Sequence, residues 1–525
     1  MILENKHLLH YIYIPLPFIA LLFFVVLPGF ALPGSDLNQA YQFEQTHKTK
    51  KPKPVLKYDS AVTIQAPFEG TQGYMAIRGN NFFTGLSDFI ITYSLNSESG
   101  TLLNKQKTLA TIQSNSASSA FNFSTILPSG LPSSLYNESI QQIAWTVING
   151  TAYLAVRGYI TGQNPYIALY TLDASTGTLA NKNSLTLPLT EPITDMQWVV
   201  VNNSAFLTLY GVDTQYSRPF ITIYSLIEQT ASLSNKQKIL LSSQESINQI
   251  TWVVVQNIAY LGLWGLDTSL NKYFITLYTL NSSIGSLTNQ QKTLLNSSES
   301  MTQIEWTVVN NNAYLGVDAY DTLSTRSLIA VYRLNQSTGK FDTRQVTYLP
   351  KGESCPQIAW VVVNNNAYLG FWGFNSLKQK YFVSSFTLNT TTLKLENRNT
   401  TLIALGNMIN AILWIVIDQT AFLAAPGFDS YRGKNFVMLY TLDATNNTLG
   451  NQQVYFLDIQ KSITQSEWVI VQNTAFLGLR GFDNLNNRFY IIVYTLNSLD
   501  GILYNKNNYL STGTDAYYGF EWVAL

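Results

Sequence analysis

Gln249-Ile-Thr-Trp-Val-Val-Val-Gln-Asn-Ile-Ala-Tyr-Leu-Gly-Leu-Trp-Gly265, continued by Lys272-Tyr-Phe-Ile-Thr-Leu-Tyr-Thr-Leu280 and Gln291-Lys-Thr-Leu-Leu295, is one unit of a pattern that recurs along the chain. It holds four short runs rich in Val, Ile, Tyr and Phe, separated by Asn, Gly and Ser turns, and such runs are typical of β-strands. The runs are apolar on both faces, which predicts sheets packed between other sheets. We name the four strands A to D.

Tryptophan marks the repeat. Each copy carries one Trp in strand A, and consecutive copies are 53 residues apart once and 54 residues apart six times: Trp145, Trp198, Trp252, Trp306, Trp360, Trp414, Trp468 and Trp522. A fixed period with four strands per unit is typical of the blades of a β-propeller. The sequence therefore predicts an all-β, eight-bladed propeller of four-stranded antiparallel blades.

Short turns fix the register between strands A and B. One copy has Asn149-Gly150, and the others have similar pairs such as Gln256-Asn257. A two-residue hairpin places the Trp opposite the Leu nine positions later, and the residue three before the Trp opposite the residue twelve after it.

A second column of the repeat is always small. Ten residues after the Trp position stand Ala76 (by alignment), Ala155, Thr208, Gly262, Gly316, Gly370, Ala424 and Gly478. Because Trp and this column lie on opposite blade faces, we expect the Trp of one blade to pack against the small residue of its neighbour, a structural role.

The two ends of the repeat array complement each other. The first copy starts with strand B at Tyr74-Met-Ala-Ile-Arg-Gly79, and the last stops after strand A at Phe520-Glu-Trp-Val-Ala-Leu525. We expect the C-terminal strand A to join the N-terminal strands B–D, because ring closure removes exposed sheet edges. The predicted propeller covers residues 61–525, with an insertion loop at about 114–136.

The N-terminus has the features of an export signal. An apolar run, Tyr11 to Val26, follows Lys6 and His7, and Gly29-Phe30-Ala31 offers small residues for cleavage. We predict a signal peptide at 1–31, a disordered basic arm at 32–60, a secreted, periplasmic or cell-surface location, and no integral membrane domain after cleavage. A retained N-terminal anchor is the alternative.

Composition limits the partners and the kinds of catalytic or metal site to be expected. The net charge is zero and 12% of residues are charged, which argues against nucleic acid as a partner. After the signal, His47 in the arm is the last histidine, so Ser-His-Asp triads and histidine metal sites are not expected in the propeller. We expect no cofactor, and a monomer.

The B–C loop repeats an acid and a base. Fifteen residues after the Trp stand Asn81 (by alignment), Asp213, Asp267, Asp321, Asn375, Asp429 and Asp483, and five further on stand Arg218, Lys272, Arg326, Lys380, Lys434 and Arg488. This pattern predicts an Asx-turn closed by a local ion pair. A ring of calcium ligands is the alternative, and we expect no structural metal.

Two columns should surround one end of the central channel, the mouth between the D–A and B–C loops. Three before the Trp, the sequence has Gln142, Asp195, Gln249, Gln303, Gln357, Ala411, Gln465 and Gly519. Twelve after it stand Arg78, Arg157, Tyr210, Trp264, Asp318, Trp372, Pro426 and Arg480. Variation among Arg, Trp, Asp and Pro is not typical of packing, and it favours a ligand site.

The stretches Ile167 to Leu179 (Ile-Ala-Leu-Tyr-Thr-Leu-Asp-Ala-Ser-Thr-Gly-Thr-Leu) and Ile90 to Leu102 resemble the repeats of lactonase-like, YVTN-type propellers. The resemblance covers about a quarter of each unit, and it implies a propeller that either binds ligands or hydrolyses lactones. That family usually has seven blades, so the eight copies and the Trp column depart from it. The stretch also resembles the quinoprotein-type repeat, without its Trp after the Thr-Gly turn. No catalytic residue of either family matches a position here.

Two classes of function follow. The favoured one is a non-enzymatic binding propeller, whose arginines Arg480, Arg78 and Arg157 come from consecutive blades and, with Tyr210, Trp264 and Trp372, would hold an acidic glycan or a protein segment at the mouth. In the alternative interpretation Glu467 and Glu521 neutralise two of these arginines. The second class is a lactonase- or glycosidase-like hydrolase or lyase using Glu305, Glu467, Glu521 or Asp318. A purely structural surface protein is a third possibility.

Overall fold

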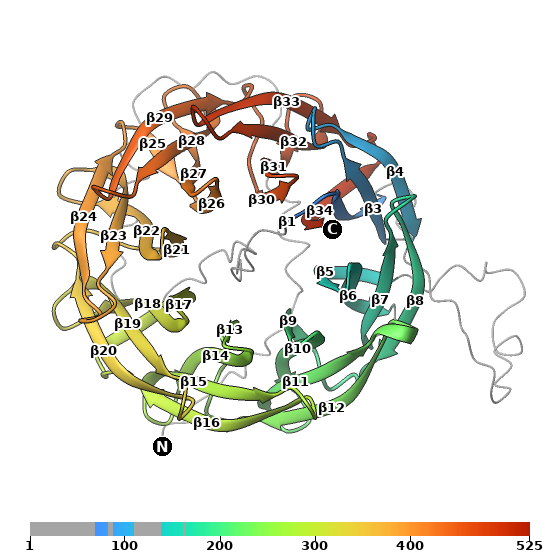
Figure 1. The fold of residues 1–525 in the computed structure, drawn as a ribbon, viewed down its shortest axis with the longest axis horizontal. Coiled ribbons are helices and arrows are strands. Elements are labelled where there is room, and N and C mark those ends of the chain that lie inside the picture. Colours follow the sequence, from blue (N-terminus) through green and yellow to red (C-terminus); the bar gives the residue numbers. More distant parts are fainter. Residues whose placement is uncertain (1–68, 82–87, 110–137, 161–163) are drawn as a thin grey trace, which may run out of the picture. The chain divides into compact units, whose positions relative to one another are not determined.

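The computed structural model describes residues 69–81, 88–109, 138–160 and 164–525. Eight four-stranded antiparallel sheets form a ring around a central channel, with strand A of each blade innermost and strand D outermost (Figure 1). The predicted eight-bladed propeller is confirmed. The predicted signal peptide, the basic arm and the 114–136 insertion lie outside the described residues.

Blades 1 to 4 occupy the first half of the ring, and each is given in the order A, B, C, D. Blade 1 is β34 (Asp515–Ala524), β2 (Gly73–Asn81), β3 (Asp88–Leu95) and β4 (Leu102–Leu109). Blade 2 is β5 (Glu138–Ile148), β6 (Thr151–Ile160), β7 (Pro165–Asp173) and β8 (Thr178–Thr186). Blade 3 is β9 (Ile193–Val201), β10 (Ser204–Asp213), β11 (Arg218–Ile227) and β12 (Ser232–Leu240), with a short 3₁₀ turn, η3 (Glu228–Thr230), before β12. Blade 4 is β13 (Gln249–Val255), β14 (Ile258–Asp267), β15 (Lys272–Asn281) and β16 (Ser286–Leu294).

Blades 5 to 8 complete the ring. Blade 5 is β17 (Glu299–Val309), β18 (Asn312–Asp321), β19 (Arg326–Asn335) and β20 (Lys340–Tyr348). Blade 6 is β21 (Gln357–Val363), β22 (Asn366–Asn375), β23 (Lys380–Leu388) and β24 (Leu395–Leu402). Blade 7 is β25 (Asn407–Ile409) with β26 (Leu413–Ile417), then β27 (Thr420–Asp429), β28 (Lys434–Asp443) and β29 (Thr448–Phe456). Blade 8 is β30 (Gln465–Val471), β31 (Thr474–Asp483), β32 (Arg488–Asn497) and β33 (Ile502–Leu510).

The ring closes as predicted. β34 pairs antiparallel with β2, which places Trp522 opposite Met75 and completes blade 1. A feature that the repeat pattern does not reveal is β1 (Glu69–Gly70), which runs parallel to β30 and extends blade 8. Two segments therefore connect blades 8 and 1: the one that runs from β1 to β2, and the one that runs from β33 to β34.

The predicted register also holds. In blade 4, Trp252 lies opposite Leu261 and Gln249 opposite Trp264. The turn residues Gln256 and Asn257 have φ angles of 49° and 59°, the left-handed region that a type I′ hairpin turn needs.

Packing between blades confirms the Trp and small columns. A Cβ added to Gly262 would lie 3.1 Å from Nε1 of Trp306 in the next blade, and one added to Gly316 would lie 2.7 Å from Nε1 of Trp360. A larger side chain would displace the indole, so the column stays small. Each Trp thereby packs across a blade interface and fills a core shared by two blades.

Strand A of blade 7 is interrupted. It is split into β25 and β26 around Ala411. In the other blades the residue at this position lies opposite the residue twelve after the Trp. In blade 7 that residue is Pro426, which has no N–H to donate to the ladder. The carbonyl of Pro426 accepts a hydrogen bond of 2.9 Å from the N–H of Asn410, as the carbonyl of Trp264 does from Asn248 in blade 4.

Candidate functional site

The glutamines predicted to ring the mouth join neighbouring blades. In each case the side-chain amide donates to a backbone carbonyl of the next strand A, and its oxygen accepts from the N–H of the same residue, with distances of 2.6–3.2 Å. We call this contact the amide bridge. The five pairs are Gln142 with Met196, Gln249 with Ile304, Gln303 with Ile358, Gln357 with Ile412, and Gln465 with Phe520.

The three predicted arginines lie in blades 8, 1 and 2, which ring closure makes consecutive. Each donates a hydrogen bond from Nη1 to a carbonyl of the next blade: Arg78 to Ile140 at 3.2 Å, Arg157 to Ile193, and Arg480 to Tyr517. All three side chains are half-buried. Their position beside one another agrees with the sequence prediction, and each one also links two blades.

The predicted aromatic residues are embedded in the same region. The Tyr210 hydroxyl donates to the Asn248 carbonyl of blade 4 at 3.1 Å. Trp264 donates from Nε1 to the Gln249 oxygen at 3.0 Å, and Trp372 donates likewise to Gln357 at 3.1 Å. Tyr210 and Trp264 are buried and Trp372 is half-buried. Stacking of these rings on a ligand stays a prediction.

Asp318 occupies the same column in blade 5 and is fully buried, with 0% exposure. The Thr302 hydroxyl donates to its carboxylate, and burial raises the pKa of Asp318 to about 7. The Cys355 thiol, from the D–A loop that leads into blade 6, lies against it, and burial together with the Asp318 charge raises the pKa of that thiol well above its ordinary value.

These contacts explain why the column twelve after the Trp varies. Arg78, Arg157 and Arg480 reach residues five positions before the next Trp, Asp318 meets Cys355 at that same position, and Tyr210 reaches the position beside it. Through this column three blades link to the next one with Arg and two others with Tyr210 and Asp318, whereas Trp264 and Trp372 bind the glutamine of their own blade. We call this region, together with the amide bridges, the inner seam. Variation that the sequence analysis attributed to ligand binding therefore has a structural explanation.

Three candidate catalytic carboxylates also lie in the inner seam. Glu305, Glu467 and Glu521 precede the Trp of strand A, and each accepts from the backbone N–H of the next blade's Trp, at 3.3 Å for Glu521 and Trp145. Burial raises the pKa of Glu521 to about 8. Burial, then repulsion by Glu521, raises the pKa of Glu467 well above its ordinary value.

The B–C loops confirm the predicted Asx-turns and correct their ion pairs. Asp213 and Asp267 each accept two backbone N–H groups of the following turn. Their cation is not the base five residues later. It is a lysine of strand D, Lys238 at 2.6 Å and Lys292 at 2.7 Å, because this strand runs past the loop base.

The bases predicted as partners have other roles. Arg218 and Arg326 donate from Nε to the carbonyl of the residue just after strand D, at 2.5 and 2.7 Å. Sequence analysis also missed a second acid column seven residues before the Trp, which includes Glu191, Glu245, Glu299 and Glu353. Lys238 contacts Glu191 at 2.8 Å, and Lys292 contacts Glu245. The 54-residue spacing would have revealed this column.

Other kinds of site were sought in the described part of the chain. No group of three or more His, Cys, Asp and Glu side chains is placed there to hold a metal. No helix in that part is long and apolar enough to cross a membrane.

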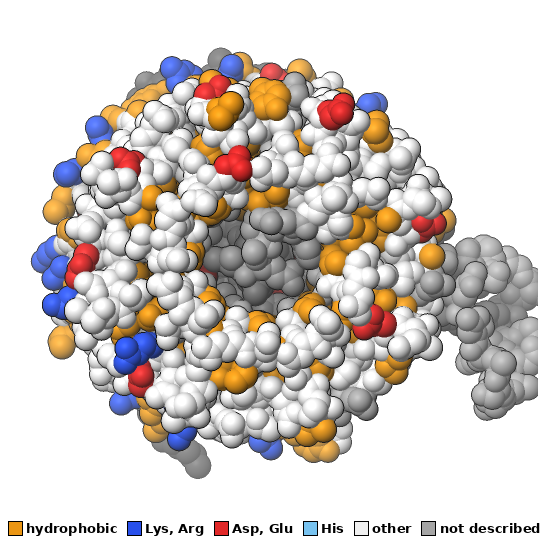
Figure 2. All heavy atoms as spheres, in the orientation of Figure 1, with side chains coloured by type: hydrophobic (Ala, Val, Ile, Leu, Met, Phe, Trp, Pro, Cys, Tyr) orange, Lys and Arg blue, Asp and Glu red, His pale blue; other side chains and the backbone are white. Residues whose placement is uncertain are grey.

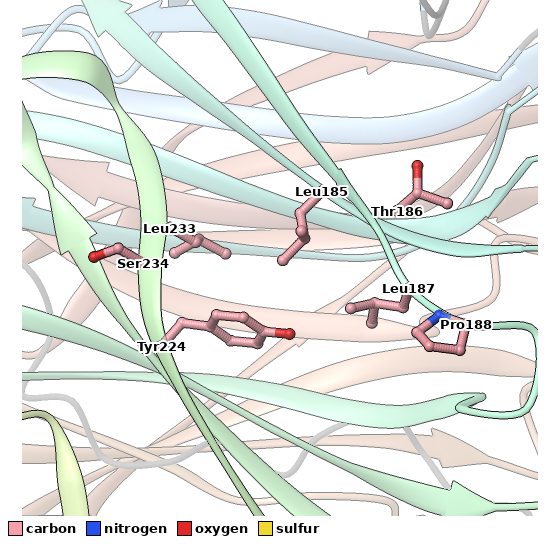
Figure 3. A pocket seen from close by; sticks show the side chains of 7 residues that line it. All are labelled: Leu185, Thr186, Leu187, Pro188, Tyr224, Leu233 and Ser234. Carbon is pink, nitrogen blue, oxygen red and sulfur yellow. The ribbon is translucent and has the colours of Figure 1, made fainter.

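One pocket lies at the outer edge between blades 2 and 3 (Figure 3). It has a volume of about 250 Å³ and is lined by Leu185, Thr186, Leu187, Pro188, Tyr224, Leu233 and Ser234. The buried hydroxyl of Tyr224 has no hydrogen-bond partner. The pocket is smaller than typical small-molecule sites of about 300–1,000 Å³, and its lining is mainly apolar.

An exposed apolar side chain recurs at the tip of most described B–C loops. Blades 3 to 8 each present one large apolar residue at the loop tip, a set that we call the B–C tips: Tyr216 (57% exposed), Leu270 (52%), Leu323 (86%), Leu377 (77%), Tyr431 (72%) and Leu485 (74%). Isolated backbone β-bridges, such as the one between Glu245 and Asp267, place the D–A loops beside the B–C loops, on the same face as the mouth. Sequence analysis did not single out this column.

Comparisons with known proteins add little. No protein-family model matches the chain, and no curated protein matches it. Similar solved structures include the Dos1 propeller (11% identity, 67% of this chain and 80% of that one, TM-score 0.39), the WD40 domain of SCAP from fission yeast (10%, 68% and 95%, 0.37) and the β-propeller domain of the trilobed protease from Pyrococcus furiosus (8%, 68% and 92%, 0.39). These low similarities carry no functional argument, and the lactonase-like resemblance stays a prediction.

Proposed function

We propose that the chain is an exported, non-catalytic binding propeller that meets its partner with the D–A/B–C face. The observation that carries this proposal is the contrast on that face: the B–C tips are exposed in six blades, whereas the polar side chains around the mouth link neighbouring blades. Exposed apolar side chains repeated around one face are typical of interaction surfaces.

An anionic ligand is the favoured soluble partner. Arg480, Arg78 and Arg157 stand side by side around the mouth, and guanidinium groups suit carboxylate, sulfate and phosphate. An acidic glycan or an acidic peptide would lie along these blades.

Calorimetric titration of anionic oligosaccharides and acidic peptides tests this ligand class. We expect binding to the wild type and at least about tenfold weaker binding by an Arg78→Ala/Arg157→Ala variant, since each charge-assisted contact is strong. Arg218→Ala, in blade 3, is the matched control, because Arg218 also donates to backbone carbonyls but lies outside the mouth column. Equal binding by all three proteins would remove the anionic ligand from the proposal.

A hydrolase is the second candidate, because Glu467 and Glu521 belong to adjacent blades and both have a raised pKa. A protonated carboxyl beside a second carboxyl is the arrangement that a general acid needs. Against it, both groups hold backbone N–H groups within the inner seam. Turnover of lactones or glycosides that is lost in Glu467→Gln and Glu521→Gln would establish the enzyme and overturn the binding proposal.

Export rests on the N-terminal sequence alone. Cell fractionation followed by N-terminal sequencing of the exported protein tests it, and we expect a new terminus close to residue 32. Recovery of the intact chain in the cytoplasm alone would contradict export.

A further inference from the structure

We propose that the D–A/B–C face docks flat on an anionic lipid bilayer, with the B–C tips entering the headgroup region. The inference rests on the proposed function in one respect, since it takes this face as the binding face. It names a different kind of partner from the soluble ligands above.

The geometry of the tips suits a flat surface. Each tip follows the end of strand B by two or three residues, as Leu323 follows Asp321 and Leu270 follows Asp267. Because the blades are copies arranged around one axis, equivalent loop positions lie at similar heights on the same face. Six of them can therefore touch a plane together, whereas a peptide could reach only neighbouring ones.

The turn itself does not require apolar tips. The B–C loop is held by an Asp or Asn that accepts two backbone N–H groups, and Leu323 and Leu377 contribute their N–H groups to these contacts, not their side chains. The side chains point away from the fold, as their exposed fractions show.

The C–D turns on the opposite face provide an internal comparison. They use the same Asx-turn, with Asn96, Asp173, Asn335, Asn389 and Asp443 as acceptors. The residue two positions after the acceptor is polar in these turns: Glu98, Ser175, Ser337, Thr391 and Thr445. At that position the B–C loops of blades 5 to 8 have Leu323, Leu377, Tyr431 and Leu485. In blade 8 the C–D turn at Asn497 has Leu499 at that position, so an apolar residue there is the exception among the C–D turns and the rule in these B–C loops.

The distribution of charged side chains indicates which face would meet an anionic bilayer. On the D–A/B–C face the loop acids such as Asp213 and Asp483 are buried, whereas Lys378, Arg432 and Arg488 are exposed beside the tips. Apolar and basic side chains together are typical of surfaces that bind anionic bilayers.

The opposite face has the reverse character. In or beside its A–B and C–D turns stand eight acids, Glu98, Asp173, Glu228, Asp342, Glu396, Asp418, Asp443 and Asp500, against three bases, Arg333, Lys340 and Lys394. Figure 2 looks along the channel onto a face where acidic side chains stand at intervals around the ring and most basic ones lie at the outer edge, which matches these turns. An anionic bilayer would therefore repel this face and attract the other one.

A second copy of the chain is the competing occupant of the tips. Docking two D–A/B–C faces against each other would bring exposed cations against cations, and like charges across an interface are unfavourable. Charge complementarity thus favours an anionic bilayer.

Vesicle co-sedimentation of the full chain tests the inference, with phosphatidylcholine vesicles and with vesicles that contain about 30 mol % phosphatidylserine. We expect the wild type to bind the anionic vesicles more tightly, and more weakly as salt is raised. A Leu323→Ser/Leu377→Ser/Leu485→Ser variant should partition at least about tenfold less. Ile284→Ser/Leu499→Ser is the matched control, since these residues are 62% and 96% exposed in C–D turns, and it should bind like the wild type. All variants share residues 1–68, so any binding by that segment cancels from the comparison.

Equal partition of the tip and control variants would overturn the inference, as would equal binding to both kinds of vesicle. Self-association that the tip variant abolishes, without vesicle binding, would also overturn it and assign the face to a second copy. The two proposals fail separately. Loss of vesicle binding with intact binding of soluble anionic ligands removes only the bilayer, whereas hydrolase activity at Glu467 and Glu521 removes only the non-catalytic function.

Discussion

The inner seam and the B–C tips lie at the same end of the blades, the seam on strands A and B and the tips on the loops beyond them, and they differ in how regularly the repeat preserves their residues. In the inner seam, Arg157, Tyr210 and Asp318 occupy one column, differ in chemistry, and all link their blade to the next. The B–C tips are uniformly Leu or Tyr, and the folded chain leaves them in solvent. Of these two columns the varied one is structural and the uniform one is exposed. Changes in the seam should therefore alter stability, and changes in the tips should alter surface binding.

Deleting Phe520 to Leu525 should have the largest effect. It removes half of β34, so much of β2 loses its partner and Trp522 no longer fills the space beside Gly478. We expect unfolding or oligomerisation through the exposed sheet edge. Thermal melting and size-exclusion chromatography measure this. A monomer with an unchanged melting temperature would contradict ring closure by β34.

Trp252→Ala should cost about 3–5 kcal/mol, because it empties a large buried aromatic site. Trp252 shares a core with Val199, Phe206 and Ile221 of blade 3, so hydrogen exchange should show lost protection mainly in blades 3 and 4. Leu270→Ser, at the tip of the same blade, is the control and should stay within about 0.5 kcal/mol. Similar urea midpoints for the two variants would erase the distinction between buried columns and tips.

The seam carboxylates predict an unusual pH dependence. The pKa values of Asp318 and Glu521 are raised to about 7 and about 8, above their unfolded values of about 4. Between these limits the folded state holds more protons, so the stability that these groups contribute is lost as pH rises.

We expect the melting temperature to be higher at pH 5 than at pH 8, and Asp318→Asn to flatten the decline. The tip variant should follow the wild-type profile, since it changes no titrating group. A melting temperature that rises steadily over this range in the wild type would show that the carboxylates are not held protonated.

Gln357→Ala should destabilise the protein by about 1–3 kcal/mol, because the N–H and carbonyl of Ile412 and the indole N–H of Trp372 lose their partner. Leu377→Ser in the same blade is the matched tip control and should be close to neutral. Chemical denaturation compares the two variants. Equal stability of both would mean that the amide bridge does not contribute to the seam.

Chelation should have the smallest effect. Three acids of the B–C loops already have cationic partners, Asp213 with Lys238, Asp267 with Lys292 and Asp429 with Arg432. We expect the melting temperature to stay unchanged in EDTA. A substantial fall in melting temperature would contradict this expectation and support the alternative, a ring of calcium ligands in the B–C loops.

The sequence predicted the fold well because the repeat multiplies each signal. Eight Trp residues, two-residue turns and complementary ends determine the number of blades, the register and the closure, and all three are confirmed. A single blade would have shown no such pattern.

The candidate site was predicted less completely, because the partners of its side chains come from the next blade. Register places Gln249 opposite Trp264, but it does not show that Gln249 also binds the backbone of Ile304, 55 residues away. Similarly, Asp213 and Arg218 lie opposite each other on strands B and C, as their spacing predicts. The ion pair of Asp213 is nevertheless with Lys238 of strand D. The B–C tips were missed because exposure depends on the direction of a turn side chain, which no periodicity reports.

The position of β34 also constrains the order of events during synthesis. Thr71 and Leu525 form a hydrogen bond across 454 positions, so β2 leaves the ribosome long before its partner exists. Contacts of such sequence separation form late, since a long loop must close first. Blades 2 to 8 can form from local hairpins. The first blade is incomplete until β34 pairs with the exposed edge of β2. Until β34 is made, the open edge of β2 is therefore a place where another chain could pair with the first blade.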